Sequence, residues 1–191
     1  MSDIDESALV ESGVSIGEGT KIWSNAQIRT GAVIGSNCVI GRNVFIDLDV
    51  HLGHNVKVQN NASLFEGVTI EDGVFVGPSV IFTNDRVPRA INPNGGLKDR
   101  DDWVLGSTLL RHGASVGAGA VIVTGVTIGR WAMIGSGSVV TRDVEDHELV
   151  VGNPARPVGF VSAGGRRFDT QAEARTATTI EQTVDRDEAT Q

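Results

Sequence analysis

The stretch IRTGAVIGSNCVIGRNVFI, residues 28–46, places an isoleucine at every sixth position, namely Ile28, Ile34, Ile40 and Ile46. A small or β-branched side chain follows four residues after each of the first three. An amphipathic helix needs apolar spacing near 3.6 residues, and a hairpin sheet needs alternation with turns every 8 to 12 residues, so this period fits neither. The stretch predicts a solenoid of short strands, in which the aliphatic side chains of successive coils stack on one another.

The repeat extends far beyond this stretch and breaks once. It runs without a missed step from Ile4 to Phe82, and it resumes in a new phase from Val104 to Val140. Three hexads make one triangular turn of about 18 residues, so we expect about seven coils, with strands about 4.8 Å apart. The pattern therefore predicts an all-β fold whose core is one column of Ile, Val and Leu. Cys38 occupies a small-residue position of that column and is interpreted as a packing residue.

The cysteine count, the net charge and the distribution of apolar residues argue against several classes of protein. The chain has 191 residues, one Cys, and 16 basic against 24 acidic side chains, which give a formal charge of -8. One cysteine makes no internal disulfide, and the first residues lack a secretory signal pattern, so we expect a cytoplasmic protein. No stretch is long and apolar enough to predict membrane insertion. The acidic balance argues against a nucleic-acid partner, because phosphates would be repelled.

Residues 84–103 leave the repeat and are predicted to form one extruded loop. They contain Pro88, Pro93 and two adjacent glycines, together with four cationic side chains. A solenoid gains no packing from an excursion of about 20 residues, and long loops in compact domains tend to be functional. We therefore expect this loop to carry part of a binding or catalytic site.

The repeat of an aliphatic residue, a Gly or acidic residue, two variable positions and a small residue covers residues 4–145. It resembles the hexapeptide-repeat acyltransferases. This resemblance implies a left-handed parallel β-helix, a hand that departs from the usual right-handed crossover rule. It also implies a homotrimer with active sites in the clefts between neighbouring subunits, and cyclic threefold closure suits a triangular prism.

Within that family, the segments QNN (residues 59–61) and FTN (residues 82–84), with residues 150–156, resemble the 3-N-acetyltransferases of nucleotide-linked 3-amino-3-deoxy sugars. The resemblance implies transfer of acetyl from acetyl-CoA to the 3-amino group of a UDP- or dTDP-linked sugar in surface-glycan biosynthesis. Many O-acetyltransferases of the family have a His at the loop root as general base, and this chain has Asn84 there. A neutral amine attacks a thioester without prior deprotonation, so an Asn that orients the amine suffices.

The predicted site residues have three roles. Glu66 lies one coil, about 5 Å, from Asn84 in the repeat, and we expect it to hydrogen-bond the amine or stabilise its developing charge. A solvated coil residue is the alternative. Small residues let the pantetheine arm of coenzyme A lie against backbone, and arginine donates two bonds to a phosphate at once. By position, the substrate contacts are Asn60, Asn61, Arg86 and Arg89, and the coenzyme contacts are Ala118, Ser136, Thr141, Arg142 and Arg156.

Two other functions stay open at this point. An O-acetyltransferase acting on a sugar or small alcohol would use His112, which follows the loop, as its base. A non-catalytic scaffold would keep the prism and bind no coenzyme. Zinc is not expected, because His112 stands about two coils beyond His54 and a zinc site needs three imidazoles about 2.1 Å from one ion.

The repeat and the composition both change near Val161. We assign residues 1–161 to the β-helix acyltransferase domain and residues 162–191 to a polar C-terminal tail. A segment rich in Gly, Arg, Thr and acidic residues buries too little apolar surface to order fully, so we expect the tail to be ordered only in part. No function is assigned to it.

Overall fold

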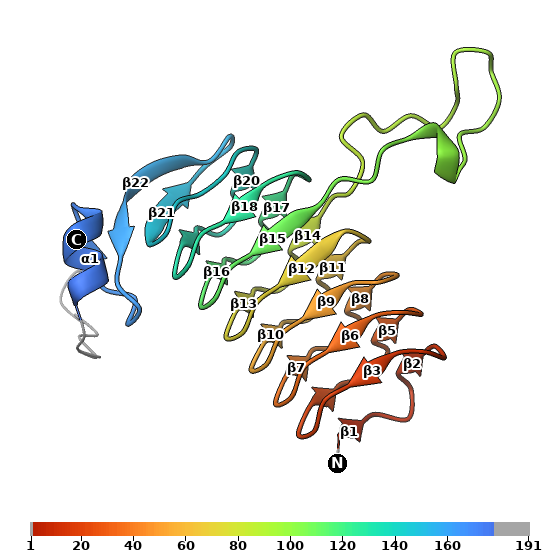
Figure 1. Ribbon diagram of the computed structural model, residues 1–191, viewed down its shortest axis with the longest axis horizontal. Coiled ribbons are helices and arrows are strands. Elements are labelled where there is room, and N and C mark those ends of the chain that lie inside the picture. Colours follow the sequence, from red (N-terminus) through yellow and green to blue (C-terminus); the bar gives the residue numbers. More distant parts are fainter. Residues whose placement is uncertain (1, 178–191) are drawn as a thin grey trace, which may run out of the picture.

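The computed structural model describes residues 2–177 and contains one solenoid of short parallel strands (Figure 1). Three sheets, which we call A, B and C, form its walls, and the chain passes from A to B to C and back to A. Most strands are two residues long and are followed by a tight turn, so the chain advances one wall every six residues. This is the all-β solenoid that the period of six predicts.

The strands and helices have the following bounds. Sheet A contains β1 (Asp3–Ile4), β4 (Lys21–Ile22), β7 (Val39–Ile40), β10 (Lys57–Val58), β13 (Phe75–Val76), β16 (Ser115–Val116), β19 (Met133–Ile134), β21 (Glu148–Val151), β22 (Arg156–Val161) and β23 (Arg167–Phe168). Sheet B contains β2 (Leu9–Val10), β5 (Gln27–Ile28), β8 (Phe45–Ile46), β11 (Ser63–Leu64), β14 (Ile81–Phe82), β17 (Val121–Ile122) and β20 (Val139–Val140). Sheet C contains β3 (Ser15–Ile16), β6 (Val33–Ile34), β9 (His51–Leu52), β12 (Val68–Ile70), β15 (Thr108–Leu110) and β18 (Thr127–Ile128). The helical elements are the 3-10 helix η1 (Arg100–Asp102) and the helix α1 (Gln171–Thr176).

Register confirms the predicted coil length. Ile22 pairs with Ile40 and Ile40 with Val58, each a step of 18 residues. Across the loop the same pairing continues, since Phe82 of β14 pairs with Ile122 of β17. Sheet A has eight parallel strands from β1 to β21 among the described residues, so the solenoid has about eight coils. The prediction of about seven was slightly low, because a further coil closes at β21 beyond the last regular hexad.

The core is the predicted column of stacked aliphatic side chains. In the two-residue strands from β4 to β20 the second residue points inward, and Ile28, Ile46, Leu64 and Phe82 of sheet B are each 0% exposed. Small side chains fill the corners between walls, and Cys38 is one of them. Burial raises the pKa of the Cys38 thiol, which keeps it protonated. The walls are therefore held by apolar contact repeated at every coil.

Each coil turns at three corners, which we name the A–B, B–C and C–A corners after the sheets they join. Many corners contain one residue with a left-handed backbone, and outside glycine these are mainly asparagines (Asn25, Asn37, Asn43, Asp49, Asn55, Asn61, Ser79, Trp131 and His147). Asparagine tolerates this conformation better than other residues with a Cβ. The Asn and Gly residues between the aliphatic positions of the repeat are thus the residues that turn the chain.

The described part of the tail continues the molecule past the last coil. β22 reverses direction and pairs antiparallel with β21 and β23, and α1 follows. The Gln171 amide donates to the Asp146 carbonyl oxygen at 2.8 Å, and Arg175 lies 3.5 Å from the Asp146 carboxylate. Residues 162–177 are therefore tied to the C–A corner, and residues 178–191 lie outside the described part. Within residues 2–177, no helix has the length and apolar character needed to cross a membrane.

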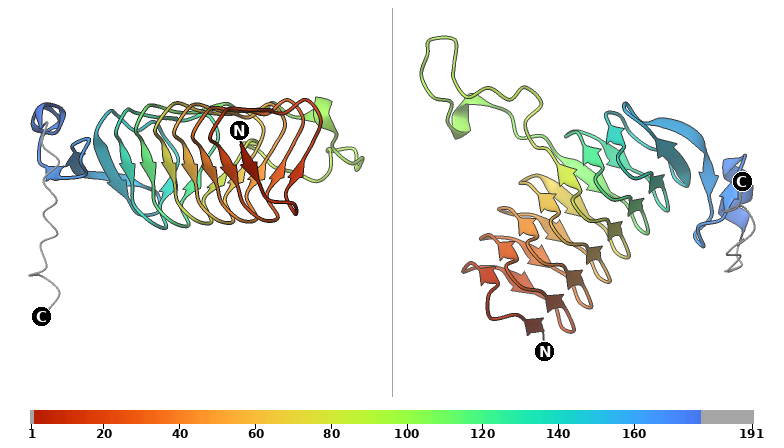
Figure 2. Two further views of the ribbon diagram at one scale, coloured as in Figure 1. Left: turned by 90° about the horizontal axis from the view of Figure 1, so that it is seen from below. Right: turned by 180° about the vertical axis from the view of Figure 1, so that it is seen from behind.

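Between β14 and β15 the chain leaves the walls. Residues 83–107, called the 83–107 loop below, contribute no strand to the three sheets. Figures 1 and 2 show the loop projecting from the stacked coils on the side away from α1. Because β14 belongs to sheet B and β15 to sheet C, the loop emerges at the B–C corner.

Candidate functional site

The root of the 83–107 loop is held by close backbone contacts. The Gly106 N–H donates to the Asn84 carbonyl oxygen at 3.0 Å, which joins the outgoing and returning segments. The Thr124 N–H donates to the Thr83 hydroxyl at 3.0 Å, so the next coil fixes the outgoing segment. A Cβ on Gly67 would lie 2.3 Å from the Gly106 carbonyl oxygen, so only glycine at position 67 allows this approach. Asn84, which is half-buried, thus has a defined place at the B–C corner.

The loop has internal order of its own. Ile91 and Leu97 form an antiparallel bridge, and the Asn92 N–H donates to the Gly96 carbonyl oxygen at 2.8 Å. η1 follows, with Asp99 as its N-cap in a reciprocal capping box with Asp102. The Asn92 side-chain amide donates to the Asp102 carboxylate at 2.7 Å, which links the bridge to η1. The loop therefore has a small hydrogen-bonded unit of its own, and its outgoing and returning segments are held at the loop root.

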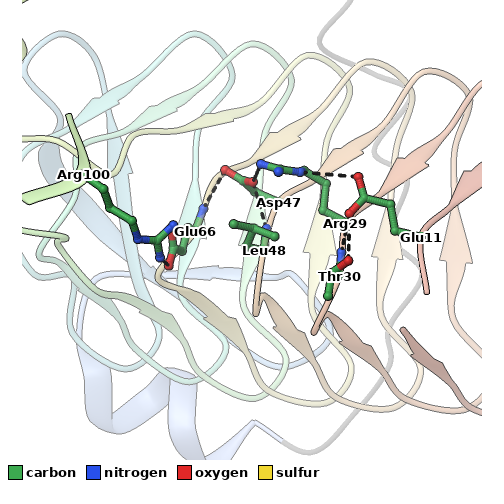
Figure 3. A network of polar contacts seen from close by, with 7 residues as sticks. All are labelled: Glu11, Arg29, Thr30, Asp47, Leu48, Glu66 and Arg100. Carbon is green, nitrogen blue, oxygen red and sulfur yellow. Dashed lines mark hydrogen bonds and ion pairs between the residues drawn. The ribbon is translucent and has the colours of Figure 1, made fainter. Parts of the chain in front are cut away.

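Figure 3 shows a line of charged side chains along the B–C corner that ends at the loop. Arg29 donates to Asp47 at 2.8 Å and lies 3.6 Å from Glu11. The Asp47 carboxylate also accepts the Glu66 N–H at 3.3 Å. The Glu66 carboxylate pairs with Arg100, which extends from η1 back to the corner. Two ion-paired groups, one around Arg29 and one formed by Glu66 and Arg100, therefore lie along this corner and are joined through the Glu66 N–H.

Glu66 and Asn84 occupy equivalent places on adjacent coils. Each lies two residues past a paired position, because Leu64 of β11 pairs with Phe82 of β14. The Glu66 side chain is only 12% exposed and is engaged by Arg100, so the solvated alternative for Glu66 was wrong. Sequence reasoning missed Arg100, because a residue inside an aperiodic loop has no repeat position from which its neighbour could be read.

The two arginines predicted to bind substrate lie on the outgoing segment of the loop. A nitrogen of the Arg86 guanidinium lies 3.3 Å from where a Cβ on Gly125 would be, so Arg86 leans over the next coil. Arg89 is exposed and donates to the carbonyl oxygen of Pro88 at 3.2 Å. Both are thus on the B–C side with Asn84 and Glu66.

The other predicted contacts divide between corners. Asn60 and Asn61 turn the A–B corner: the Asn60 side-chain oxygen accepts the Arg42 N–H at 2.9 Å, and Asn61 has a φ of 63°. Ala118 and Ser136 lie in the same A–B corner on later coils, and both are exposed. A Cβ on Gly117 would lie 2.5 Å from the Ser136 nitrogen, so the coils here pack backbone against backbone.

The remaining predicted coenzyme residues lie elsewhere. Thr141 and Arg142 are exposed at the B–C corner of a late coil. Arg156 begins β22 and donates to the Ala155 carbonyl oxygen at 2.9 Å. One copy of the chain therefore presents two candidate surfaces, one along the A–B corner and one along the B–C corner, separated by the width of sheet B.

The outer face of sheet B, between these two corners, is mostly apolar. On sheet B the first residue of each strand points outward, and these residues include no charged side chain (Leu9, Gln27, Phe45, Ser63, Ile81, Val121 and Val139). Sheet A, in contrast, presents Asp3, Lys21 and Lys57. Ile81 is 42% exposed and Leu9 is 65% exposed, so this wall leaves apolar surface in contact with solvent.

His112 lies at the C–A corner, away from the loop root. It lines a shallow depression with Glu71, Asp72 and Arg130. Its backbone N–H donates to the Glu71 carboxylate at 2.8 Å, and its ring meets the Trp131 ring edge-on with centroids 5.2 Å apart. Among residues 2–177, no three His, Cys, Asp or Glu side chains are placed to hold a metal ion together.

Two family models match the repeats. The model of the bacterial transferase hexapeptide (six repeats) matches residues 13–47 and 107–142. The model of the hexapeptide repeat of succinyl-transferase matches residues 31–66. The 83–107 loop separates the two matched blocks.

Curated relatives match parts of the chain. The dTDP-3-amino-3,6-dideoxy-alpha-D-galactopyranose 3-N-acetyltransferase of Aneurinibacillus thermoaerophilus is 56% identical over 57 residues, which are 30% of this chain and 30% of that protein. Serine acetyltransferase of Escherichia coli (strain K12) is 36% identical over 87 residues, which are 45% of this chain and 31% of that protein. Each match spans less than a third of the relative's length.

Solved structures share the fold. A variant of GDP-perosamine N-acetyltransferase from Caulobacter crescentus, in complex with CoA and GDP-perosamine, superposes with a TM-score of 0.56 at 23% identity. That likeness covers 83% of this chain and 56% of the other. The acetyltransferase domain of PglB from Neisseria gonorrhoeae, in complex with acetyl coenzyme A, gives 0.52 at 20% identity, over 81% of this chain and 56% of the other.

Proposed function

Since this chain is built from the hexapeptide repeats of bacterial transferases, we propose that it is an acetyl-CoA-dependent N-acetyltransferase. The acceptor is the 3-amino group of a UDP- or dTDP-linked amino-deoxy sugar of surface-glycan biosynthesis. The local 56% identity to a 3-N-acetyltransferase of such a sugar supports this class of acceptor.

The positions of the histidines support an amine, and not a hydroxyl, as the group that accepts acetyl. None of the four His residues of the chain lies in the B–C corner or in the 83–107 loop, and Asn84 stands at the loop root. A hydroxyl nucleophile needs a general base within hydrogen-bond reach, whereas a neutral amine does not. Asn84 therefore orients the amine for attack on the thioester carbon. The C–S bond then breaks, and the departing CoA sulfur takes the proton that the amine loses.

Rate in this mechanism comes from holding two reactants in one place. Removing translational and rotational freedom lowers a bimolecular barrier by up to about 7 to 11 kcal/mol when the reacting atoms are aligned. Arg86 and Arg89 bind the pyrophosphate of the sugar nucleotide, and Asn60 and Asn61 contact sugar or nucleotide. Ala118 and Ser136 lie against the pantetheine arm, and the coenzyme phosphates meet Thr141, Arg142 and Arg156.

A homotrimer brings the two candidate surfaces together. Three copies that pack their apolar sheet B faces around a threefold axis join the A–B corner of one copy to the B–C corner of the next, since a cyclic contact pairs different surfaces. Ala118 and Ser136 of one copy then face Asn84 of its neighbour across a cleft. Covering sheet B also removes the exposed Leu9 and Ile81 side chains from water.

Incubation with acetyl-CoA and a panel of UDP- and dTDP-linked sugars, read by mass, tests the acceptor. We expect acetylation of 3-amino sugars and none of their 3-hydroxy analogues. Asn84→Ala should lower kcat by about 100-fold, the size typical for loss of one positioned polar contact. Asn94→Ala, the same change at an exposed loop position, is the matched control and should stay within about twofold.

Two outcomes would contradict the proposal. Loss of activity in His112→Ala with Asn84→Ala unaffected would indicate an O-acetyltransferase whose base lies at the C–A corner. Calorimetry with acetyl-CoA that shows no heat of binding would indicate a non-catalytic scaffold.

A further inference from the structure

We propose that Arg100 is a positioning residue of this site, whose ion pair with Glu66 fixes the 83–107 loop relative to the B–C corner. Its consequence for catalysis rests on the proposed function, whereas its effect on the loop does not. Glu66 in this view acts through Arg100 on the loop, and does not itself touch the sugar amine.

Contacts within the solenoid fix the backbone of Glu66 independently of the loop. The Glu66 N–H is held by Asp47, and Asp47 in turn accepts the Leu48 N–H at 2.8 Å and pairs with Arg29. Arg29 thus balances the charge of Asp47, which is 8% exposed, and Glu66 next to it is 9% exposed. A carboxylate this shielded needs a cationic partner, because desolvation disfavours the charged form. Arg100 is the partner that the structure provides (Figure 3).

Arg100 extends from a part of the loop that several hydrogen bonds hold in place. Arg100 is the first residue of η1, which Asp99 caps, and Asn92 ties η1 to the Ile91–Leu97 bridge through Asp102. A contact at one residue of such a unit therefore orients the whole unit. The guanidinium side chain is 66% exposed, so the pair is accessible to solvent and of modest strength.

The pair determines where the outgoing segment of the loop lies. Arg86 and Arg89, which bind the pyrophosphate in the proposed function, lie in the same loop as Arg100, just before the Ile91–Leu97 bridge. Without the pair they would sample many positions, and the entropy of ordering them would oppose substrate binding. Binding of acetyl-CoA would be less affected, because Ala118 and Ser136 lie on the solenoid and not in the loop.

Thermolysin cleavage measures loop order without any substrate. Thermolysin cuts on the amino side of exposed aliphatic residues, and Ile91 and Val104 in the loop are 53% and 87% exposed. Cleavage of a native protein follows the population of the locally opened state. Mass spectrometry then reports cuts at these two bonds in wild type, Glu66→Gln, Arg100→Gln and the double variant.

We expect Arg100→Gln and Glu66→Gln each to raise the cleavage rate about three- to tenfold, the range of a partly exposed charge-assisted contact. The double variant should be no worse than either single variant, because both remove one interaction. Lys98→Gln removes the same charge two residues away and should cleave like wild type. Arg100 is exposed, so its variant should fold even where Glu66→Gln does not.

Steady-state kinetics distinguish a positioning role of Arg100 from a purely structural one. Arg100→Gln should raise KM for the sugar nucleotide about fivefold, leave kcat and KM for acetyl-CoA within about twofold, and recover in part in Arg100→Lys. Wild-type cleavage rates in Arg100→Gln would overturn the positioning role. Loosened loops in a protein that acetylates no amino sugar would overturn the proposed function and leave the positioning role standing.

Discussion

The solenoid and the 83–107 loop fix their backbones with different interactions. In the solenoid each buried side chain contacts the same kind of residue one coil above and one coil below, and Ile28, Ile46 and Leu64 have no exposed surface. In the loop, Val87, Leu97 and Val104 are each more than half exposed, and order comes from capping, an Asn–Asp hydrogen bond and one ion pair. Apolar burial holds the walls, and polar contacts hold the segment placed beside Asn84.

This difference has a physical reason. Apolar burial is not directional, so it stabilises any coil that repeats the spacing, and it leaves the outer surface free to vary. Polar contacts are directional and weaker in net free energy, so they define one geometry while leaving it easy to open. In the proposed function the loop admits and releases substrate, and the second kind of interaction suits that task.

Removing the same atoms from the solenoid and from the loop should have very different effects on stability. Leu64→Ala deletes a side chain with no exposed surface, and Leu97→Ala deletes one that is 81% exposed. We expect Leu64→Ala to lower the free energy of unfolding by about 3 to 5 kcal/mol, and Leu97→Ala to change it by less than about 0.5 kcal/mol. Urea unfolding of both variants measures this, and equal losses would show that the loop is part of the core.

Excising the loop tests whether it is dispensable for folding and needed for transfer. Asn84 and Gly106 are joined by a backbone hydrogen bond of 3.0 Å, so a short Gly-Ser linker can replace residues 86–104. We expect the unfolding midpoint to stay close to wild type and acetyl-CoA to bind, while acetyl transfer falls by about 100-fold or more. Retained transfer would place the acceptor site elsewhere on the prism.

The same difference decides what the sequence could predict. The period of six residues predicted the three walls, the 18-residue register and the column of inward aliphatic side chains. It could do so because the same position is aliphatic again in every coil. The position of Glu66 one coil from Asn84 followed from the same arithmetic, since Leu64 pairs with Phe82. Its partner did not, because Arg100 lies 34 residues away in a segment without period.

Corner chemistry also limited the prediction of the site. Asn60 and Asn61 were assigned to substrate from their position in the chain, and the structure shows them turning the A–B corner. Asparagine suits both tasks, so sequence alone does not separate a turn residue from a ligand contact. Trp131 went unnoticed because a bulky residue rarely takes the left-handed conformation, which it adopts here with a φ of 56°.

Substitutions at Asn61 separate its two roles. Asn61→Ala places a poorly suited residue at a φ of 63° and removes the hydrogen bond from Asn43, so the free energy of unfolding should fall by about 1 to 2 kcal/mol. Asn61→Gly loses the same exposed hydrogen bond but takes the left-handed backbone without strain, so it should cost well under 1 kcal/mol. Thermal unfolding of the two variants measures the structural part.

Kinetics of Asn61→Gly then isolate the contact with substrate. A rise in KM for the sugar nucleotide with unfolding near wild type would support the proposed contact at the A–B corner. An unchanged KM would restrict Asn61 to turning the chain, as Asn25 and Asn43 do on earlier coils.

The smallest expected effect is acid loosening of the loop. Hydrogen bonds from the Asp99 N–H and the Asn92 amide lower the pKa of Asp102. A carboxyl group whose pKa is depressed by folding stabilises the fold above its unfolded pKa, and this contribution is lost as pH falls through the folded value. For Asp102 that window lies below about pH 4. We expect the NMR signal of the Asn92 side-chain amide to move there, as its hydrogen bond to Asp102 breaks.

The strands of the solenoid should not loosen over the pH range in which the loop does. Asp5 and Glu11 in the first coils also have lowered pKa values, from hydrogen bonds with Ser7 and with Thr30 respectively, but both are surface groups on walls held by apolar burial. Amide signals of buried strand residues should therefore stay unchanged while that of Asn92 moves, and Asp102→Asn should abolish the movement. If the strand signals shifted together with Asn92, loop and solenoid would open as one cooperative unit, and polar contacts at the loop would contribute to the stability of the walls.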